Sequence, residues 1–383
     1  MESKTQSLTD STVRLQIEED DTCLGIDTTP HQDDVAYRKM YVQIEHLPWW
    51  PPVNYLSEVF KNHGHEIRVV GGAVRDIILK KTPKDIDLCT TAAPAEMIAI
   101  LKDNEIRHRE TGIQHGTVTV YKKGHEFEVT SLRKDAVIDG NRVCLYGRSF
   151  KEDAERRDLT INAMSLEVDG QLHDFFSGRE HLTQGKLRFV VDAEVRVAED
   201  PLRILRYFRF SSSGLYDGEC PEEYRILFTK QRSCLADPSL VAGERIWKEM
   251  GRVLASDKCC DILDAMKRCK ILRSLWFPVI EAPLDRLINC RYKVEGVDQD
   301  TRAAALLGLI FKGRPDQLTD LCNRWKVSNK VREVAMCAVN ISGLRDLDSV
   351  KQHLYYLLPS ARFKEEKIIF CQVHVTLIIF QSI

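Results

Sequence analysis

Two aspartates separated by a single residue, Asp85 and Asp87, have the spacing of a metal-binding pair in this 383-residue sequence. In an extended segment, residues i and i+2 project from the same face, so the two carboxylates would lie side by side while Ile86 points into the core. Mg²⁺ prefers hard oxygen ligands of this kind and is usually held by one or two carboxylates together with substrate phosphates. The pair is equally compatible with a solvated loop in which Asp87 caps a following helix.

A glycine pair, Gly71 and Gly72, lies shortly before these acids, at the end of an apolar run that predicts a strand. Without Cβ atoms, the backbone N–H groups of this turn can approach a ligand, and a helix starting near Ala73 would direct its positive end to the same place. Arg75 adds a planar guanidinium group suited to a phosphate. A glycine pair alone is common in ordinary turns, but beside the acids it predicts a site for a nucleoside triphosphate and its metal.

A third carboxylate is needed if two metal ions are to be held on one face. The alternating stretch 125–133 offers Glu126 and Glu128 on the same side of a predicted strand. We favour Glu128, which has β-branched and apolar neighbours, although an exposed surface strand would show the same alternation.

Two adjacent arginines, Arg156 and Arg157, provide further cations. On a helix they would diverge by about 100°, so at most one would face the triphosphate. We predict that this is Arg157, with Arg156 solvated or paired with Asp153 or Glu155.

The stretch "AEDPLRILRYFRF", residues 198–210, combines an apolar stripe with a charged stripe on a predicted helix. The apolar stripe is Leu202, Leu205 and Phe208, and the charged stripe is Asp200, Arg203, Arg206 and Arg209. A carboxylate accepts from the exocyclic amine of cytosine or adenine and an arginine donates to the adjacent ring nitrogen, whereas uracil and guanine present the opposite polarity. Asp200 and Arg203 are therefore predicted to accept C and A and to reject U and G. Alternatively, Asp200 caps a helix that has Pro201 in its first position.

The elements that would position these side chains predict an α+β fold class. From about residue 40 to 176, short strands alternate with helices, including a hairpin whose turn is Asp169–Gly170. From Ala198 to about Ser342, apolar residues recur every three or four positions, which predicts an all-α second half. The net charge of −2 means that a polyanion would have to bind at a local basic patch.

Six segments resemble, in order, the motifs of the class II tRNA nucleotidyltransferases, the CCA-adding enzymes of eukaryotes and bacteria. They are "GGAVRD", "DIDL", "ERRDLTINAM", "FFSGREHLTQGKLRF", "EDPLR" and "GERIWKEM", and they span roughly residues 45–260. The resemblance implies template-independent addition of C, C and A to the 3′ end of tRNA from CTP and ATP. It also implies that the helical part grips the acceptor stem through its shape and backbone.

The resemblance assigns a role to each candidate residue. It implies Asp85 and Asp87 as metal ligands, Gly72 and Arg75 as nucleotide contacts, and Arg157 at the triphosphate. It further implies Asp200 and Arg203 as the protein template for the incoming base, with Arg206 and Arg209 extending that wall.

The expected organisation is a nucleotidyltransferase head with a mixed β-sheet, followed by an all-α neck and body. We place a disordered acidic leader at 1–39, the head at 40–190, the neck at 191–257, the tRNA-binding body at 258–345 and an atypical, truncated tail at 346–383. The leader is not Arg-rich as transit peptides are, which predicts a cytoplasmic or nuclear protein without mitochondrial targeting. No membrane partner is expected, and the sequence leaves both a monomer and a homodimer open.

Three other functions remain open at this point. A poly(A) polymerase of the same superfamily would share the head. A metal-dependent glycosyltransferase would use Asp85 and Asp87 but leave Asp200 and Arg203 without a role. A catalytically inactive tRNA-binding homologue would retain the fold alone.

Overall fold

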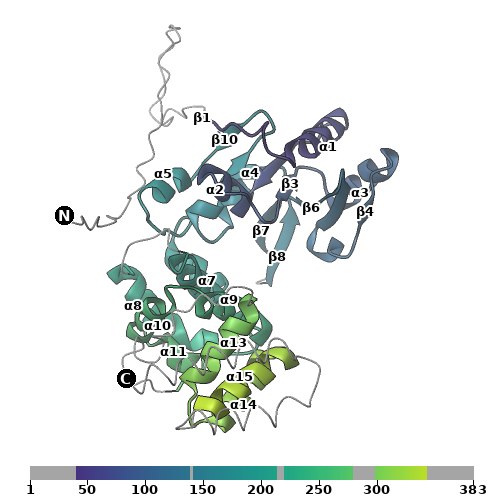
Figure 1. Cartoon of the computed structure of the whole chain (residues 1–383). Coiled ribbons are helices and arrows are strands. Elements are labelled where there is room, and N and C mark those ends of the chain that lie inside the picture. The colour runs from purple at the N-terminus through teal and green to yellow at the C-terminus, as the bar shows by residue number, and fades with distance from the viewer. Residues whose placement is uncertain (1–39, 139–140, 214–219, 279–297, 343–383) are drawn as a thin grey trace, which may run out of the picture. The chain divides into compact units, whose positions relative to one another are not determined.

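The computed structural model describes residues 40–138, 141–213, 220–278 and 298–342. The predicted leader at 1–39 and tail at 346–383 therefore lie outside the described residues. Figure 1 shows strands and helices together in the first half of the described chain and helices alone in the second half, from α6 onward. This division confirms the predicted α+β class, whereas the boundaries at 190 and 257 stay a prediction.

The main sheet of the head has the strand order β1-β10-β9-β2-β3-β6-β5-β4 in the described part of the chain, and β7 and β8 form a separate two-stranded sheet. Strand β3 is parallel to β6, and the other neighbouring pairs for which the register is known are antiparallel. β2 is buried at every position, because its residues "IRVV" lie in the middle of the sheet. The strands are β1 Met40–Tyr41, β2 Ile67–Val70, β3 Asp87–Thr90, β4 His108–Arg109, β5 Thr117–Lys122, β6 His125–Ser131, β7 Arg133–Ile138, β8 Asn141–Tyr146, β9 Ser165–Leu166 and β10 Gln171–His173.

The helices of the head flank these strands, and the remaining helices follow residue 192. The predicted hairpin at Asp169–Gly170 is present as β9–β10, and β5 and β6 form a second hairpin around Gly124. The helices are α1 Trp50–Asn62, α2 Gly72–Ile78, α3 Pro94–Asp103, α4 Phe150–Glu155, α5 Gly178–Thr183, α6 Ala193–Glu199, α7 Leu202–Ser211, α8 Glu222–Gln231, α9 Gly243–Leu254, α10 Cys259–Arg268, α11 Ile271–Ser274, α13 Gln299–Ile310, α14 Pro315–Trp325 and α15 Asn329–Ser342.

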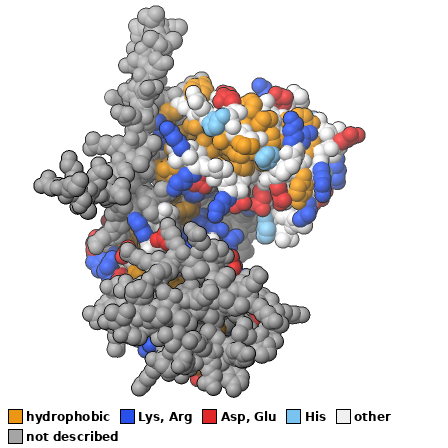
Figure 2. All heavy atoms as spheres, in the orientation of Figure 1, with side chains coloured by type: hydrophobic (Ala, Val, Ile, Leu, Met, Phe, Trp, Pro, Cys, Tyr) orange, Lys and Arg blue, Asp and Glu red, His pale blue; other side chains and the backbone are white. Residues whose placement is uncertain are grey.

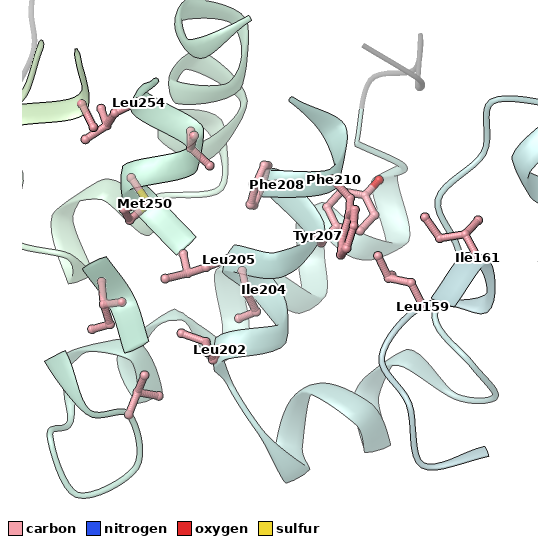
Figure 3. Packing of buried hydrophobic residues seen from close by; sticks show 14 of the residues in the cluster. Leu159, Ile161, Leu202, Ile204, Leu205, Tyr207, Phe208, Phe210, Met250 and Leu254 are labelled. Carbon is pink, nitrogen blue, oxygen red and sulfur yellow. The ribbon is translucent and has the colours of Figure 1, made fainter. Parts of the chain in front are cut away.

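Helix α7 joins the head to the helical half through a shared hydrophobic core. Figure 3 shows Tyr207 lying toward Leu159 of the head and Leu205 lying toward Met250 of α9. Leu202, Leu205 and Phe208 are buried, so the predicted apolar stripe is confirmed. The charged positions between them stay partly exposed, which places the stripe of Asp200, Arg203, Arg206 and Arg209 beside this core.

Two stretches of the helical half do not form a single amphipathic helix. The stretch 259–276 does not form one continuous helix, because Lys270 adopts a left-handed conformation with φ of 58° between α10 and α11. Helix α13 does not have a single apolar stripe, since buried residues from Thr301 to Ile310 cover most of its circumference.

We expect Gly243→Ala to destabilise the fold by about 1–3 kcal/mol, the usual cost of overpacking. A Cβ at Gly243 would overlap the carbonyl oxygen of Arg324 and approach within 2.7 Å of the Cα of Trp325, and backbone of a packed helix cannot give way cheaply. Gly251→Ala in the same helix is the matched control, because its Cβ would meet nothing closer than the Trp247 ring at 3.5 Å. Urea unfolding of the two variants followed by circular dichroism measures the difference, and equal stability would contradict the prediction.

Candidate active site

Three carboxylates gather where strand β3 begins. Asp87 is the first residue of β3, Asp85 lies in the bend before it, and Ile86 between them is buried as expected. Strand pairing sets Glu128 of β6 directly opposite Asp87, whereas Glu126 lies two residues earlier along β6. Burial raises the pKa of Asp87, and the charges of Glu128 and Asp85 raise it further against the opposing effect of Arg157. A cation between these acids would relieve that repulsion.

The donor set fits a divalent ion that completes its coordination with substrate and water. Within the ranges that the structure describes, no three His, Cys, Asp or Glu side chains converge as a ready-made metal site. Mg²⁺ is commonly held by only one or two carboxylates plus substrate phosphates, so Asp85 and Asp87 suffice on the protein side.

Arg156 and Arg157 follow the end of α4 and do not lie on it, so their placement on a helix is wrong, whereas the predicted pairing of Arg156 with Asp153 is confirmed. Both guanidinium groups bind the buried carboxylate of Asp153, at 2.6 Å and 3.1 Å. Burial alone would raise the pKa of Asp153, but the two arginines hold it below its ordinary value. A single buried acid therefore fixes both cations next to the sheet.

The first glycine of the pair makes room for Arg157. Gly71 has a φ of 70°, and a Cβ there would lie 2.8 Å from Nη1 of Arg157. The same Nη1 donates to the carbonyl oxygen of Asn162 at 3.2 Å. The sequence predicts that the backbone at this turn approaches a ligand. In the structure, the space left by the missing Cβ of Gly71 is occupied by the Arg157 side chain.

The Arg75 guanidinium is held in one orientation. Its Nη1 donates to Oδ1 of Asn162 at 2.8 Å, and its Nη2 donates to Oδ1 of Asp76 at 2.8 Å. It also lies over the ring of Phe210, 5.2 Å from the centroid. A Cβ at Gly72 would be 3.5 Å from Nη2 of Arg75, so the glycine and the arginine lie side by side.

At the start of α7, Asp200 and Arg203 bind other groups and not each other's side chains. The Oδ1 of Asp200 accepts from the N–H of Leu202 at 3.2 Å, as a capping residue does, and its Oδ2 accepts from Nη2 of Arg245 at 2.7 Å. Arg203 donates to Oε2 of Glu199 at 2.6 Å. It also donates to the carbonyl oxygens of Arg196 and Arg156, at 2.9 Å and 2.8 Å.

The two remaining arginines of the charged stripe pair with buried acids. Arg206 binds Asp158 at 2.6 Å and Arg209 binds Glu249 at 2.6 Å. Asp158 belongs to the head and Glu249 to α9, so the stripe links the head, α7 and α9 by charge. The sequence did not single out these two acids. The only signal for Glu249 was its position on the apolar face of the helix "GERIWKEM".

A cleft of about 800 Å³ collects part of the predicted site. Gly72, Arg75, Asp85 and Asp87 line it from the head, and Arg209 lines it from α7. The predicted residues Glu128, Arg157, Asp200, Arg203 and Arg206 are not among its lining residues.

Four further basic residues, which the sequence patterns did not single out, also line the cleft: Lys81, Lys84, Arg252 and Arg302. Lys84 directly precedes Asp85, which was an available signal, but nothing in the sequence connects Arg252 or Arg302 with the acids. In Figure 2, Lys and Arg side chains lie next to Asp and Glu side chains on the described surface.

Asp158→Asn is expected to lower the free energy of unfolding at pH 7 by about 1–3 kcal/mol, because Arg206 loses a buried charged partner. Burial would raise the pKa of Asp158. The charge of Arg206 and the hydrogen bonds that the Asp158 carboxylate accepts lower that pKa below the ordinary 3.8. A carboxylate whose pKa is lower in the folded than in the unfolded state stabilises the fold fully at a pH above its unfolded-state pKa. This stabilisation is lost as the pH falls through the folded-state pKa. The difference between wild type and variant, measured by urea unfolding, should therefore shrink below about pH 4. A constant difference from pH 7 to pH 3 would contradict it.

Known proteins resemble this chain over most of its described length. Residues 67–188 match the family described as "Poly A polymerase head domain". The mouse protein "CCA tRNA nucleotidyltransferase 1, mitochondrial" is 35% identical over 74% of this chain and 64% of its own length. The zebrafish protein of the same name is 32% identical over 80% of this chain and 71% of its own length. The crystal structure of the Bacillus stearothermophilus CCA-adding enzyme in complex with CTP matches with a TM-score of 0.68 and 25% identity, over 88% of this chain and 83% of that one.

These relatives correct the expected location. The prediction of a cytoplasmic or nuclear protein without mitochondrial targeting is wrong, because the mouse and zebrafish relatives are mitochondrial. The prediction failed because it rested on the charge of residues 1–39, and that composition does not decide the compartment. Separately, none of the helices in the described ranges has the length and apolar character needed to cross a membrane.

This chain is 32% identical to the zebrafish relative over 71% of that relative's length. It combines a head of mixed strands and helices with acids at the start of β3 and a charged stripe on α7. The chain belongs to the family of class II tRNA nucleotidyltransferases, the CCA-adding enzymes.

Proposed function

We propose that this protein adds C, C and A to the 3′ end of tRNA, using CTP and ATP and no nucleic-acid template. The observation that carries the proposal is the cleft in which Asp85 and Asp87 share one space with Gly72 and Arg75. Acids suited to a metal and a cation suited to a phosphate meet there, as transfer of a nucleotide requires. The names of the mouse and zebrafish relatives support tRNA as the acceptor.

The metal implied by this site is Mg²⁺, held by Asp85 and Asp87 with Glu128 beside them. When bound, Mg²⁺ would stabilise the charge that develops on the attacking hydroxyl and on the departing pyrophosphate. Burial raises the pKa of Asp87, and the positive charge of Arg157 opposes that rise, which favours the ionised carboxylate that a metal ion requires.

Binding of the triphosphate is assigned to Arg75 and Arg157. Each guanidinium is already fixed by protein groups, Arg75 by Asp76 and Asn162 and Arg157 by Asp153. Cations that are oriented in advance lose little side-chain entropy on binding and hold the α-phosphorus in line for attack.

Reading of the base is assigned to Asp200 and Arg203, which keep spare hydrogen-bonding capacity. An arginine has five N–H donors, and the contacts that Arg203 makes leave its Nε–H and one Nη2–H for a ring nitrogen. A carboxylate offers about four lone-pair sites, of which Leu202 and Arg245 occupy two at Asp200. The pair can therefore meet cytosine or adenine without breaking its own contacts. Arg206 and Arg209 would extend this base-binding surface along α7.

The test supplies labelled CTP or ATP separately to tRNA transcripts that end before, within and after the CC step. Addition of two C residues followed by one A supports the proposal. Unlimited addition of A would favour a poly(A) polymerase, which shares the matched head domain. Binding of tRNA without any incorporation would favour an inactive homologue.

A further inference from the structure

We propose that Arg252 and Arg302 bind a backbone phosphate of the RNA strand whose 3′ end is extended. This inference deepens the function proposed above and rests on it. It assigns the helical wall of the cleft to the RNA, whereas the head wall carries the acids and the groups assigned to the triphosphate.

The charge of the cleft favours a polyanionic ligand. Six Lys or Arg side chains line it against three Asp side chains. Arg75 is paired with Asp76, and Arg209 is paired with Glu249. Across the described ranges, the other four basic side chains have no carboxylate within ion-pair distance, so their charge is available to a ligand. These four are Lys81, Lys84, Arg252 and Arg302.

A shielded hydroxyl group lies in the same wall as the two arginines. Arg252 lies in the last turn of α9, Arg302 lies in the first turn of α13, and these two helices pack against each other. Ser256, just after α9, also lines the cleft, and its Oγ is out of solvent without a hydrogen-bond partner among the described residues. This hydroxyl lies beside the two arginines, and it could donate a hydrogen bond to an acceptor on a ligand once it turns into the cleft. A phosphate oxygen between two guanidinium groups is such an acceptor.

Spacing along α7 separates the RNA from the triphosphate. The base-reading residues lie at the start of α7, and the cleft reaches α7 only from Arg209 onward. At 1.5 Å per residue, Arg203 and Arg209 are about 9 Å apart along the helix axis. If the incoming nucleotide has its base at Arg203 and its phosphates at Arg75, Arg252 and Arg302 do not contact that nucleotide and remain free to bind RNA. A cleft of about 800 Å³ is also near the upper end of the range for a single small ligand, which leaves room for the RNA end.

The test uses Arg252→Gln, Arg302→Gln and the double variant, with Arg109→Gln as the matched control. Arg109 is an exposed arginine of β4, at the edge of the head sheet and outside the predicted tRNA-binding body, and it does not line the cleft. The probes are a tRNA transcript lacking its terminal CCA and CTP, and thermal unfolding verifies that each variant is folded. In the double variant we expect the dissociation constant and the KM for tRNA to rise at least about tenfold, with the KM for CTP within about twofold of wild type. The slope of log Kd against log salt should become shallower by about 0.7–0.9 for each phosphate that the protein no longer neutralises.

Each other outcome has a distinct meaning. A raised KM for CTP with unchanged tRNA affinity would overturn the inference, because the two arginines would then hold the triphosphate. Changes no larger than those of Arg109→Gln would also overturn it, since both side chains would then be merely solvated. If the wild-type protein incorporates no nucleotide, yet the double variant loses tRNA affinity with a shallower salt slope, the proposed function fails while the phosphate site stands.

Discussion

Asp87→Asn should reduce nucleotide addition at least about a thousandfold while leaving tRNA affinity within about twofold of wild type. Asparagine keeps the size of the side chain but removes the charge that would hold a divalent ion next to Asp85. Such an ion contributes several kcal/mol to the transition state, and each 1.4 kcal/mol corresponds to a tenfold change in rate. Single-turnover incorporation of labelled CTP measures the loss, and filter binding of tRNA measures the affinity.

The control for this prediction lies on the neighbouring strand. Glu126 is an exposed acid of β6 like Glu128, but in the sheet it is paired with Tyr121 of β5, away from the start of β3. Glu126→Gln should leave incorporation within about twofold of wild type, whereas Glu128→Gln should reduce it, because only Glu128 faces Asp87. Equal activity of Asp87→Asn and Glu126→Gln would remove the acids from the mechanism.

Local structure was predictable because periodicity and turn chemistry are local. The strand before Gly71, the hairpin at Asp169–Gly170 and the apolar stripe of α7 follow from side-chain spacing alone. The place where α4 ends was not predictable in this way. Arg156 and Arg157 still fit a helical pattern, but the chain turns after Glu155 so that both reach one buried acid, Asp153.

The partners of the charged stripe depend on tertiary packing, which a single sequence does not show. Arg206 finds Asp158 across 48 residues of chain, and Arg245 finds Asp200 across 45. The grouping of Arg252 and Arg302 in one cleft likewise requires α9 and α13 to pack together. Gly71 illustrates the same limit, since the sequence predicts that this glycine lets the backbone approach a ligand, whereas its missing Cβ accommodates Arg157. Sequence spacing identifies the groups that can do chemistry, and packing decides which of them meet.

Asp200→Ala should lower kcat/KM for both CTP and ATP and should weaken the discrimination against UTP and GTP. A uracil or guanine at this position would set its carbonyl oxygen against the carboxylate, and a mispaired buried group costs about 1–3 kcal/mol, or roughly 5- to 150-fold. Removing the carboxylate removes that penalty for the wrong bases and one hydrogen bond for the right ones. The measurement is kcat/KM for each of the four nucleotides on a tRNA transcript lacking its terminal CCA.

The alanine variant also removes the side chain that accepts from the N–H of Leu202 at the start of α7, so a loss of fold must be separated from a loss of base reading. Asp200→Asn separates them, because asparagine caps a helix as well as aspartate does but presents an amide that can turn either a donor or an acceptor to the base. The asparagine variant should therefore keep the thermal stability of wild type and still accept UTP and GTP more readily. Arg245→Gln keeps the carboxylate and its bond to Leu202, so it should retain the preference for C and A. Unchanged four-way discrimination in both the alanine and the asparagine variants would move base reading away from the start of α7, because alanine offers the base neither a donor nor an acceptor.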